Sequence, residues 1–331
     1  MTTATTRFDV IDGAKGVGII FVVFGHAWRG AQGAGIIPDT SGADGTNLFI
    51  TVDTLIYAFH MPLFFLLSGL LFLEALQKHD TFSLLRGRTT RLLWPMALWT
   101  WLFFGIKLLA GSEANAPVTV SDFPLIPLPP FEHLWFLWAL FLIQIGLVLA
   151  YRLGGTNIPP MTLRWVAGIG ALALALINPY LSVPSLIWGP MVAHMPYFLL
   201  GITAGGYLNW RPNIAFTALS IAAFVALLWM VGGQKASVLH SLALVTAGWI
   251  FLLGALRPSA LLRVLCVLGQ GSMAIYLTHT IFSAALRIVM LKFDIDDLAL
   301  VLTATTLVGL IVPLAVLAVV RRLRLTKLLG F

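Results

Sequence analysis

The sequence has little charge and almost no cysteine. Only 10% of its 331 residues are Asp, Glu, Lys or Arg, and Cys266 is the single cysteine. One cysteine excludes an intrachain disulfide and a metal site built from several thiolates. No long hydrophilic stretch interrupts the chain, so residues 1–331 are predicted to form one domain. The N-terminus lacks the basic n-region of a cleavable signal peptide, and the first apolar run is therefore expected to remain in the protein.

Apolar residues are what the chain has in excess. Hydrophobic residues make up 59% of the sequence and its mean hydropathy is +0.95, which is far outside the range of soluble domains. Stretches near the 20 residues needed to cross a bilayer recur along the chain. The sequence therefore predicts an all-α integral membrane protein, a bundle of about ten transmembrane helices. The expected spans are residues 13–28, 48–76, 92–109, 134–151, 165–180, 186–206, 214–231, 238–256, 264–290 and 298–320.

The distribution of charge gives an orientation for these spans. With both termini cytoplasmic, fifteen of the 20 Lys and Arg residues fall in inner segments and five in outer ones. Such a bias is the positive-inside pattern of a multi-pass protein of the cell inner (plasma) membrane. The net charge of +7 is then a feature of the inner face. It suits anionic membrane lipid or a phosphorylated cytosolic ligand better than nucleic acid.

The first span carries two ionisable residues on one face. Lys15 and His26 are eleven residues apart, which returns to nearly the same helix face. The two are separated by roughly 16 Å along the axis. In the plainest interpretation the lysine snorkels to the inner interface and the histidine caps the outer end. Because ionisable groups inside a span are costly, the alternative is a functional pathway. Glycines at positions 13, 16, 18 and 25 would let a neighbouring helix or a thin ligand approach.

A second group of cations opens the third span. Arg88 and Arg91 are at i and i+3, and so share a face of an α-helix. They could be topogenic charge alone. The planar fork of arginine also suits phosphate, and the pair lies where a phosphorylated donor would arrive from the cytosol.

The histidines are predicted at different depths. His26, His133 and His240 are expected near the outer boundary, and His60, His194 and His279 near the middle of the membrane; most of these six should be structural, hydrogen-bonded groups. His26 is the candidate general base because it shares the stripe with Lys15. Glu132, next to His133, could orient that imidazole or its partner, or could simply be a hydrated loop carboxylate. Ser68 precedes Gly69 in an apolar run, which is typical of helix packing rather than of a nucleophile.

Five motifs in order resemble a known family. They are Lys15 and His26 with ten residues between them, the segment 59–69 (Phe-His-Met-Pro-Leu-Phe-Phe-Leu-Leu-Ser-Gly), Arg88-Thr-Thr-Arg91, His133-Leu-Trp-Phe136 and Ile275-Tyr-Leu-Thr-His279. Together they are similar to membrane acyltransferase family 3, especially its fucose 4-O-acetylase-like branch. The similarity covers nearly the whole chain.

This resemblance implies an activity and roles for the residues. It implies an O-acyltransferase that moves an acyl group, commonly acetyl from cytosolic acetyl-CoA, to a hydroxyl of a cell-surface polysaccharide, glycolipid or similar acceptor, without a metal. His26 matches the catalytic histidine of the family, with Glu132 and His133 as further candidate catalytic residues. Lys15, Arg88 and Arg91 match the basic positions associated with donor binding. Lysine stands here where many relatives have arginine, so bidentate geometry is lost at that position.

Two other classes of function are compatible with these residues. A transporter or flippase for a glycan or lipid-linked sugar would use intramembrane His and Lys as proton-coupling sites. It should carry an inverted repeat, and beyond two His-Met-Pro segments the sequence has no sign of one. A purely structural membrane subunit leaves the aligned charges unexplained.

Overall fold

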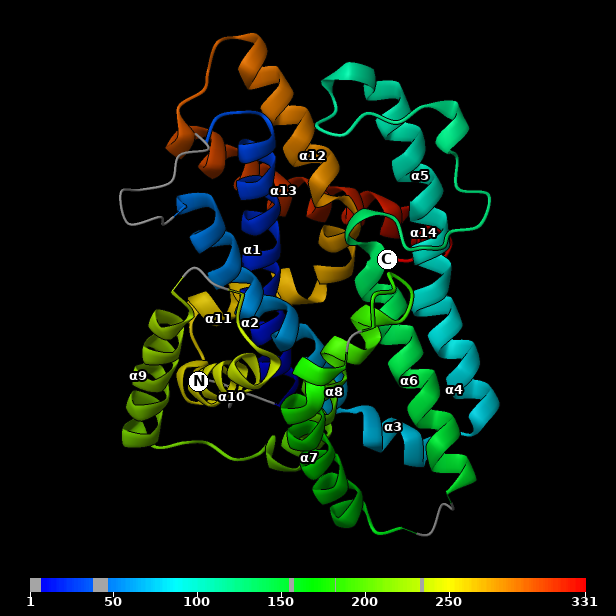
Figure 1. The fold of residues 1–331 in the computed structure, drawn as a ribbon, viewed down its shortest axis with the longest axis vertical. Helices are drawn as coiled ribbons and strands as arrows, with labels where there is room; N and C mark the ends of the chain where they lie inside the picture. The colour runs from blue at the N-terminus through cyan, green and yellow to red at the C-terminus, as the bar shows by residue number, and fades with distance from the viewer. Residues whose placement is uncertain (1–6, 38–46, 155–157, 182, 233–234) are drawn as a thin grey trace.

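The computed structural model describes residues 7–37, 47–154, 158–181, 183–232 and 235–331. Within these ranges the protein is helical and contains no β-strand. Figure 1 shows α9 at one edge of the molecule and α4 at the opposite edge, with α1 and α2 between them. The α-helices are α1 (Arg7–Gly33), α2 (Leu48–Leu70), α3 (Phe72–Lys78), α4 (Thr81–Arg88), α5 (Trp94–Ala110), α6 (Trp135–Leu153), α7 (Pro160–Ile177), α8 (Gly189–Ala204), α9 (Ile214–Val231), α10 (Val238–Ala255), α11 (Ala260–Gln270), α12 (Ser272–Lys292), α13 (Leu298–Arg322) and α14 (Thr326–Leu329).

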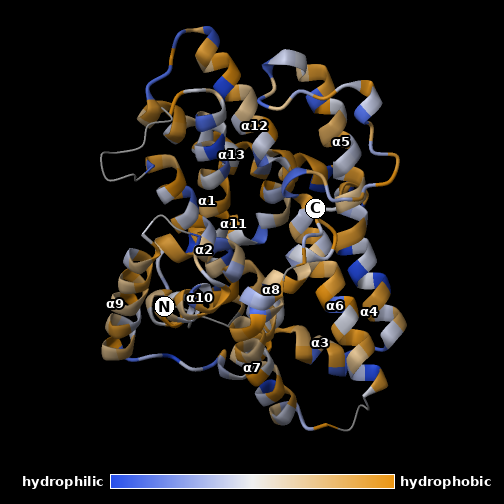
Figure 2. Ribbon diagram, in the orientation of Figure 1, coloured by the Kyte–Doolittle hydropathy of each residue, from blue (hydrophilic) through white to orange (hydrophobic). Residues whose placement is uncertain are grey.

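The prediction of a polytopic all-α membrane protein is confirmed. Eight helical segments among the described residues are long and apolar enough to cross a membrane. They correspond to eight of the ten expected spans. The other two are α1, which is long but carries several charges, and α8, which has only 16 residues. Figure 2 shows hydrophobic residues along most helices and hydrophilic residues mainly toward loops and helix ends. Because helices such as α9 expose most of their apolar side chains, their surroundings must be lipid.

The expected span over residues 264–290 is wrong in its first turns. The chain breaks at Gly271, so that α11 ends at Gln270 and the spanning helix α12 begins at Ser272. The reason is a close approach, since a side chain on Gly271 would lie 2.3 Å from Leu314 of α13. The break lets α11 pack along α1 as a separate helix.

Glycine allows the closest helix contacts of the bundle. A Cβ atom at Gly16 of α1 would lie 2.1 Å from the carbonyl oxygen of Leu265, and one at Gly269 would lie 1.9 Å from that of Asp12. Backbones that approach this closely tolerate no side chain between them. Gly13 and Gly16 therefore admit α11, whereas Gly18 and Gly25 face side chains of α2.

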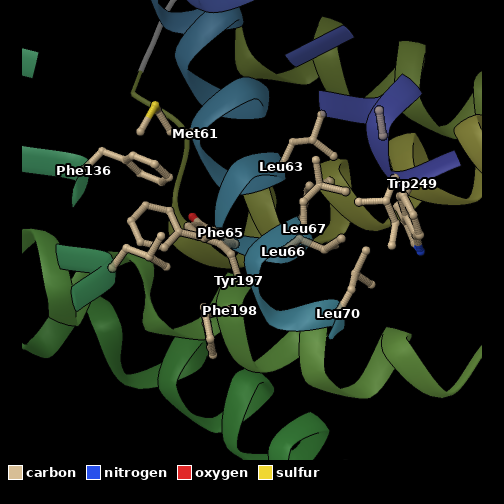
Figure 3. Packing of buried hydrophobic residues seen from close by; sticks show 14 of the residues in the cluster. Met61, Leu63, Phe65, Leu66, Leu67, Leu70, Phe136, Tyr197, Phe198 and Trp249 are labelled. Carbon is tan, nitrogen blue, oxygen red and sulfur yellow. The ribbon is translucent and has the colours of Figure 1, made fainter. Parts of the chain in front are cut away.

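The core is built on α2 and α8. Figure 3 shows side chains of α2 pointing toward Phe136 on one side and toward Trp249 on the other. Gly69 packs against the backbone of α8, where its Cβ would lie 2.2 Å from the carbonyl oxygen of Phe198. The hydroxyl of Ser68 donates to the carbonyl of Phe64 in the previous turn. The Ser-Gly pair thus serves helix packing, as the sequence predicts.

Candidate functional site

A cavity of about 570 Å³ lies among α1, α2, α5, α6 and α12. In Figure 1, α1 and α2 lie between α9 on one side and α5 and α6 on the other, with α12 above them. The α1 residues that line the cavity belong to the C-terminal half of that helix, from Val22 to Gly30. Part of the proline-rich connection after α5, residues 113–116, also lines the cavity. A cavity of this size is typical of a site for a small molecule or for part of a larger one.

Three imidazole rings meet at the cavity wall. The ring centroids of His26 and His279 are 5.0 Å apart, and the ring of His133 is 5.4 Å from each of them. His26 and His133 line the cavity, whereas His279 is fully buried behind them. The structure therefore brings together two predicted site residues, His26 and His133, and adds His279, which the sequence had suggested at another depth.

The hydrogen bonds of two rings define their tautomers. His279 donates from Nδ1 to the carbonyl oxygens of Ile275 at 2.8 Å and Tyr276 at 2.9 Å, so its buried and unpartnered Nε2 carries only a lone pair. His133 donates from Nε2 to the carbonyl of Tyr276 at 3.1 Å, and the Tyr276 hydroxyl donates to the carbonyl of His133 at 2.5 Å. These reciprocal bonds fix His133 to α12. Within the described part of the chain, no hydrogen bond from the protein reaches His26.

Among the described residues, no group of three or more His, Cys, Asp or Glu side chains is arranged to hold a metal ion.

Charged side chains line the cavity on the side of the α1 C-terminus. Arg29 makes a bidentate ion pair with Asp53 of α2, at 2.5 and 2.9 Å, and its guanidinium lies 5.0 Å from the ring centre of Tyr57. Lys107 of α5 pairs with Glu132. Glu132, expected as a partner of an imidazole, therefore has a lysine as its partner instead. The reason lies in its backbone, because a positive φ of 50° at Glu132 begins the turn that leads into α6.

The basic residues Lys15, Arg88 and Arg91 do not line this cavity. Lys15 pairs with Asp12 at 3.2 Å, on the part of α1 that packs against α11. Arg88 is half-buried over the ring of Phe72, and its Nε has no partner among the described residues. Arg91 is exposed.

Local structure accounts for the difference between the two arginines. Residues Thr89–Leu93 form a π-helical turn between α4 and α5, so the α-helical spacing assumed in the sequence argument does not apply. Such turns occur often at functional sites. Asp80 caps the start of α4, and hydrogen bonds from the Ser83 side chain and backbone hold the pKa of the Asp80 carboxyl below its usual range.

An aromatic layer lies between the cavity and Arg88. The rings of Phe64 and Phe136 are 6.0 Å apart, and Phe136 is 5.7 Å from Tyr276. Along α2 and α3, His60 lines the cavity and Phe72 contacts Arg88 twelve residues later. This corresponds to roughly 18 Å along the helices. The cavity that His26 lines does not include Lys15, Arg88 or Arg91, and a pathway from these cations to His26 stays a prediction.

Each of the remaining intramembrane histidines is hydrogen-bonded to a backbone carbonyl. His60 and His194 each donate from Nδ1 to the carbonyl four residues earlier, at 2.6 and 2.8 Å, so the two His-Met-Pro segments share a local geometry. His240 donates from Nε2 to the carbonyl of Leu227 at 2.8 Å. Their satisfied hydrogen bonds agree with the expectation that most of the histidines have structural roles.

Comparison with known proteins identifies the family. The acyltransferase domain model of family 3 matches residues 8–320. The chain belongs to this acyltransferase family. It is also similar to the nodulation protein NolL of Mesorhizobium japonicum, with 24% identity over 350 residues that cover 93% of this chain and 85% of the relative. The nodulation protein NolL of Sinorhizobium fredii is 25% identical over 224 residues, 67% of this chain and 55% of the relative. No solved structure matches.

The protein is therefore a multi-pass membrane acyltransferase, and the family favours acyl transfer over the transport alternative.

Two residues at the cavity were not recognised from the sequence as parts of the site. His279 was expected near the middle of the membrane and not beside His26, yet its ring centroid is 5.0 Å from that of His26. Arg287, two turns further along α12, was counted only as an outer charge, although it is buried and lines the cavity.

Proposed function

We propose that this protein is an O-acyltransferase that uses His26 to move an acyl group, acetyl in the first instance, from acyl-CoA to a hydroxyl of a carbohydrate acceptor. The observation that carries the proposal is that the His26 imidazole is free to bond a substrate. Its imidazole faces the cavity, is held among two other histidines and has no hydrogen-bond partner among the described protein groups. A general base needs a free nitrogen within reach of the hydroxyl that it deprotonates.

The reaction balances with His26 as the only proton carrier. The acceptor hydroxyl gives its proton to a nitrogen of His26 while its oxygen attacks the thioester carbonyl carbon. The carbon–sulfur bond breaks, and the leaving CoA thiolate takes the proton back from the imidazolium. The products are the ester and CoA with its free thiol.

His279 has a positioning role in this proposal. Its Nε2 offers a lone pair, lies in a fully buried ring and has no partner among the described residues. With the ring centroids 5.0 Å apart, His279 packs against the His26 ring and would limit its orientation. His133, fixed by its reciprocal bonds with Tyr276, forms the opposite wall.

The donor would bind at the other end of the bundle. Lys15, Arg88 and Arg91 supply positive charge there, and the orphaned Nε of Arg88 supports a role in holding the phosphates of the donor. The arm that bears the thioester would have to displace the Phe64–Phe136 contact to reach His26. The bias of fifteen basic residues against five supports both termini in the cytoplasm of an inner-membrane protein. The donor then arrives from the cytosol and the acceptor from outside.

The test is transfer of radiolabelled acetyl from acetyl-CoA to surface glycan in cells that express the protein or its His26→Ala variant. We expect His26→Ala to reduce labelling by about a hundredfold to ten-thousandfold, the usual contribution of a general base. His240→Ala is the matched control, because that imidazole is bonded to the Leu227 carbonyl and does not line the cavity.

Undiminished labelling by His26→Ala, with equal protein in the membrane, would refute the role of His26. A burst of CoA release from purified protein without acceptor, with an acetyl group retained on the chain, would replace the general-base route by an acyl-histidine route.

A further inference from the structure

Arg287 is a buried cation without a carboxylate. Only 7% of its surface is exposed, yet it lines the cavity. Its one hydrogen bond to the described protein is from Nη2 to the Asn115 side-chain oxygen, at 3.2 Å. A guanidinium has five N–H donors, so most of its capacity is unused. Buried charges are ordinarily paired with an opposite charge, and no carboxylate among the described residues pairs with this guanidinium.

The other charges at the cavity are neutralised in pairs. Arg29 is bound to Asp53, Lys107 to Glu132, and Glu113 to Lys292 at 3.2 Å. Each of these pairs cancels when Lys292, which does not itself line the cavity, is counted with Glu113. Arg287 is then the one charged lining residue for which the described residues show no oppositely charged partner. A ligand that carries a single negative group could pair with the Arg287 guanidinium.

The guanidinium of Arg287 lies close to His26. A Cβ atom added to Gly30 would lie 2.1 Å from Nη1 of Arg287, so the guanidinium rests on the backbone of α1 at Gly30. Gly30 is one helix turn beyond His26, a rise of roughly 6 Å. Asn115 holds the arrangement from the other side, because its Nδ2 donates to the Gly30 carbonyl at 3.2 Å. A group bound to Arg287 is thus about one sugar ring away from the base.

From this geometry we infer that the acceptor is an acidic sugar, whose carboxylate or phosphate binds Arg287 while a hydroxyl of the same or the adjoining ring faces His26. The inference rests on the proposed function and specifies its substrate class. Arginine binds both anions in bidentate fashion, so either acid satisfies the site. A neutral sugar of the same size would leave the buried charge unpaired.

The experiment compares three acceptors with purified protein in liposomes and acetyl-CoA: a glucuronate oligosaccharide, a glucose phosphate and a neutral glucose oligosaccharide. We expect kcat/KM for one acidic acceptor to exceed that for the neutral one at least tenfold. In Arg287→Gln this preference should vanish through a higher KM for the acid, with little change for the neutral sugar. The acid that is preferred distinguishes carboxylate from phosphate recognition.

Two further variants separate an effect on acceptor recognition from an effect of misfolding. Gly30→Ala would push the flexible tip of Arg287 aside and should raise KM for the acidic acceptor without removing the charge. Arg164→Gln is the control, since this arginine bonds to the Ile202 carbonyl outside the cavity and should leave the preference unchanged.

The possible failures are distinguishable. A neutral acceptor used as well as the acids, or an equal loss on all three in Arg287→Gln, would overturn the assignment of Arg287 while the acyltransferase proposal stands. Absence of transfer to any hydroxyl, with His26→Ala no different from the parent protein, would instead remove the proposed function.

Discussion

The cavity and the basic face near Arg88 differ in how they treat charge. In the cavity, Arg29 and Lys107 are paired with carboxylates from other elements. Among the described residues, the His26 imidazole has no hydrogen-bond partner and the buried Arg287 has no carboxylate partner. On the basic face, Arg88 and Arg91 have no carboxylate partner among the described residues. Under the proposed function, the cavity would hold the acceptor beside His26, and the basic face would bind the phosphates of the donor. An aromatic layer keeps the two apart.

Separation of this kind has a physical advantage. Acyl-CoA is hydrolysed if water reaches the thioester beside a general base, so a site closed until the donor enters protects it. Under the proposed function, the contact of Phe64 with Phe136 would be part of that closure. The following predictions test whether the two regions are separate and whether each does what its charges indicate.

The largest expected effect is that the cavity and the basic face are accessible from opposite sides of the membrane. With Cys266 replaced by Ser, single cysteines at Ala284 in the cavity and at Thr90 on the basic face should react with a membrane-impermeant maleimide from opposite sides of the bilayer. Labelling in intact cells and in inverted vesicles checks this, and each cysteine should react in one preparation only. Labelling of both positions from the same side would contradict the separation.

A split between kcat and KM is the second prediction. His26→Ala should lower kcat by a hundredfold or more and leave KM for acetyl-CoA unchanged, because the base does not hold the donor. Arg88→Met should instead raise KM for acetyl-CoA about tenfold or more, through loss of a charge-assisted hydrogen bond. Steady-state kinetics in detergent measures both constants. Equal effects of both variants on KM would indicate one merged site.

A third prediction concerns the packing that holds α1, the helix that links the two regions. Gly16→Ala should reduce stability by about 1–3 kcal/mol, because the new methyl group meets the Leu265 carbonyl. Gly105→Ala is the control, since nothing lies within 4 Å of a Cβ there. Thermal unfolding of the purified variants checks this, and a lower melting temperature for Gly105→Ala than for Gly16→Ala would contradict it.

The smallest effect is expected at Glu132. Glu132 is the partner of Lys107 in a partly exposed ion pair. We therefore expect Glu132→Gln to lower the rate of acetyl transfer by at most about fivefold, which corresponds to about 1 kcal/mol. The assay is acetyl transfer at saturating donor. A loss of a hundredfold would restore the catalytic role suggested by its position beside His133.

Sequence reasoning succeeded where the signal was local. Apolar runs gave the bundle, and eight of the ten expected spans correspond to helical segments long and apolar enough to cross a membrane. Chemical type and motif also selected His26 and His133, which do share a cavity. The expectation for Arg88 and Arg91 was less accurate, since a π-helical turn changes the angle between successive residues and no spacing rule reveals such a turn.

What the sequence determined by itself is a membrane bundle of apolar helices with its basic residues biased to one side, because hydropathy and charge depend only on composition along the chain. Tertiary structure alone decided that His279 backs His26, that Glu132 serves Lys107 and that Arg287 is buried in the cavity without a carboxylate. These relations depend on how helices far apart in sequence are rotated and paired. That rotation is set by close backbone contacts such as Gly16 with Leu265, which composition along one helix does not specify.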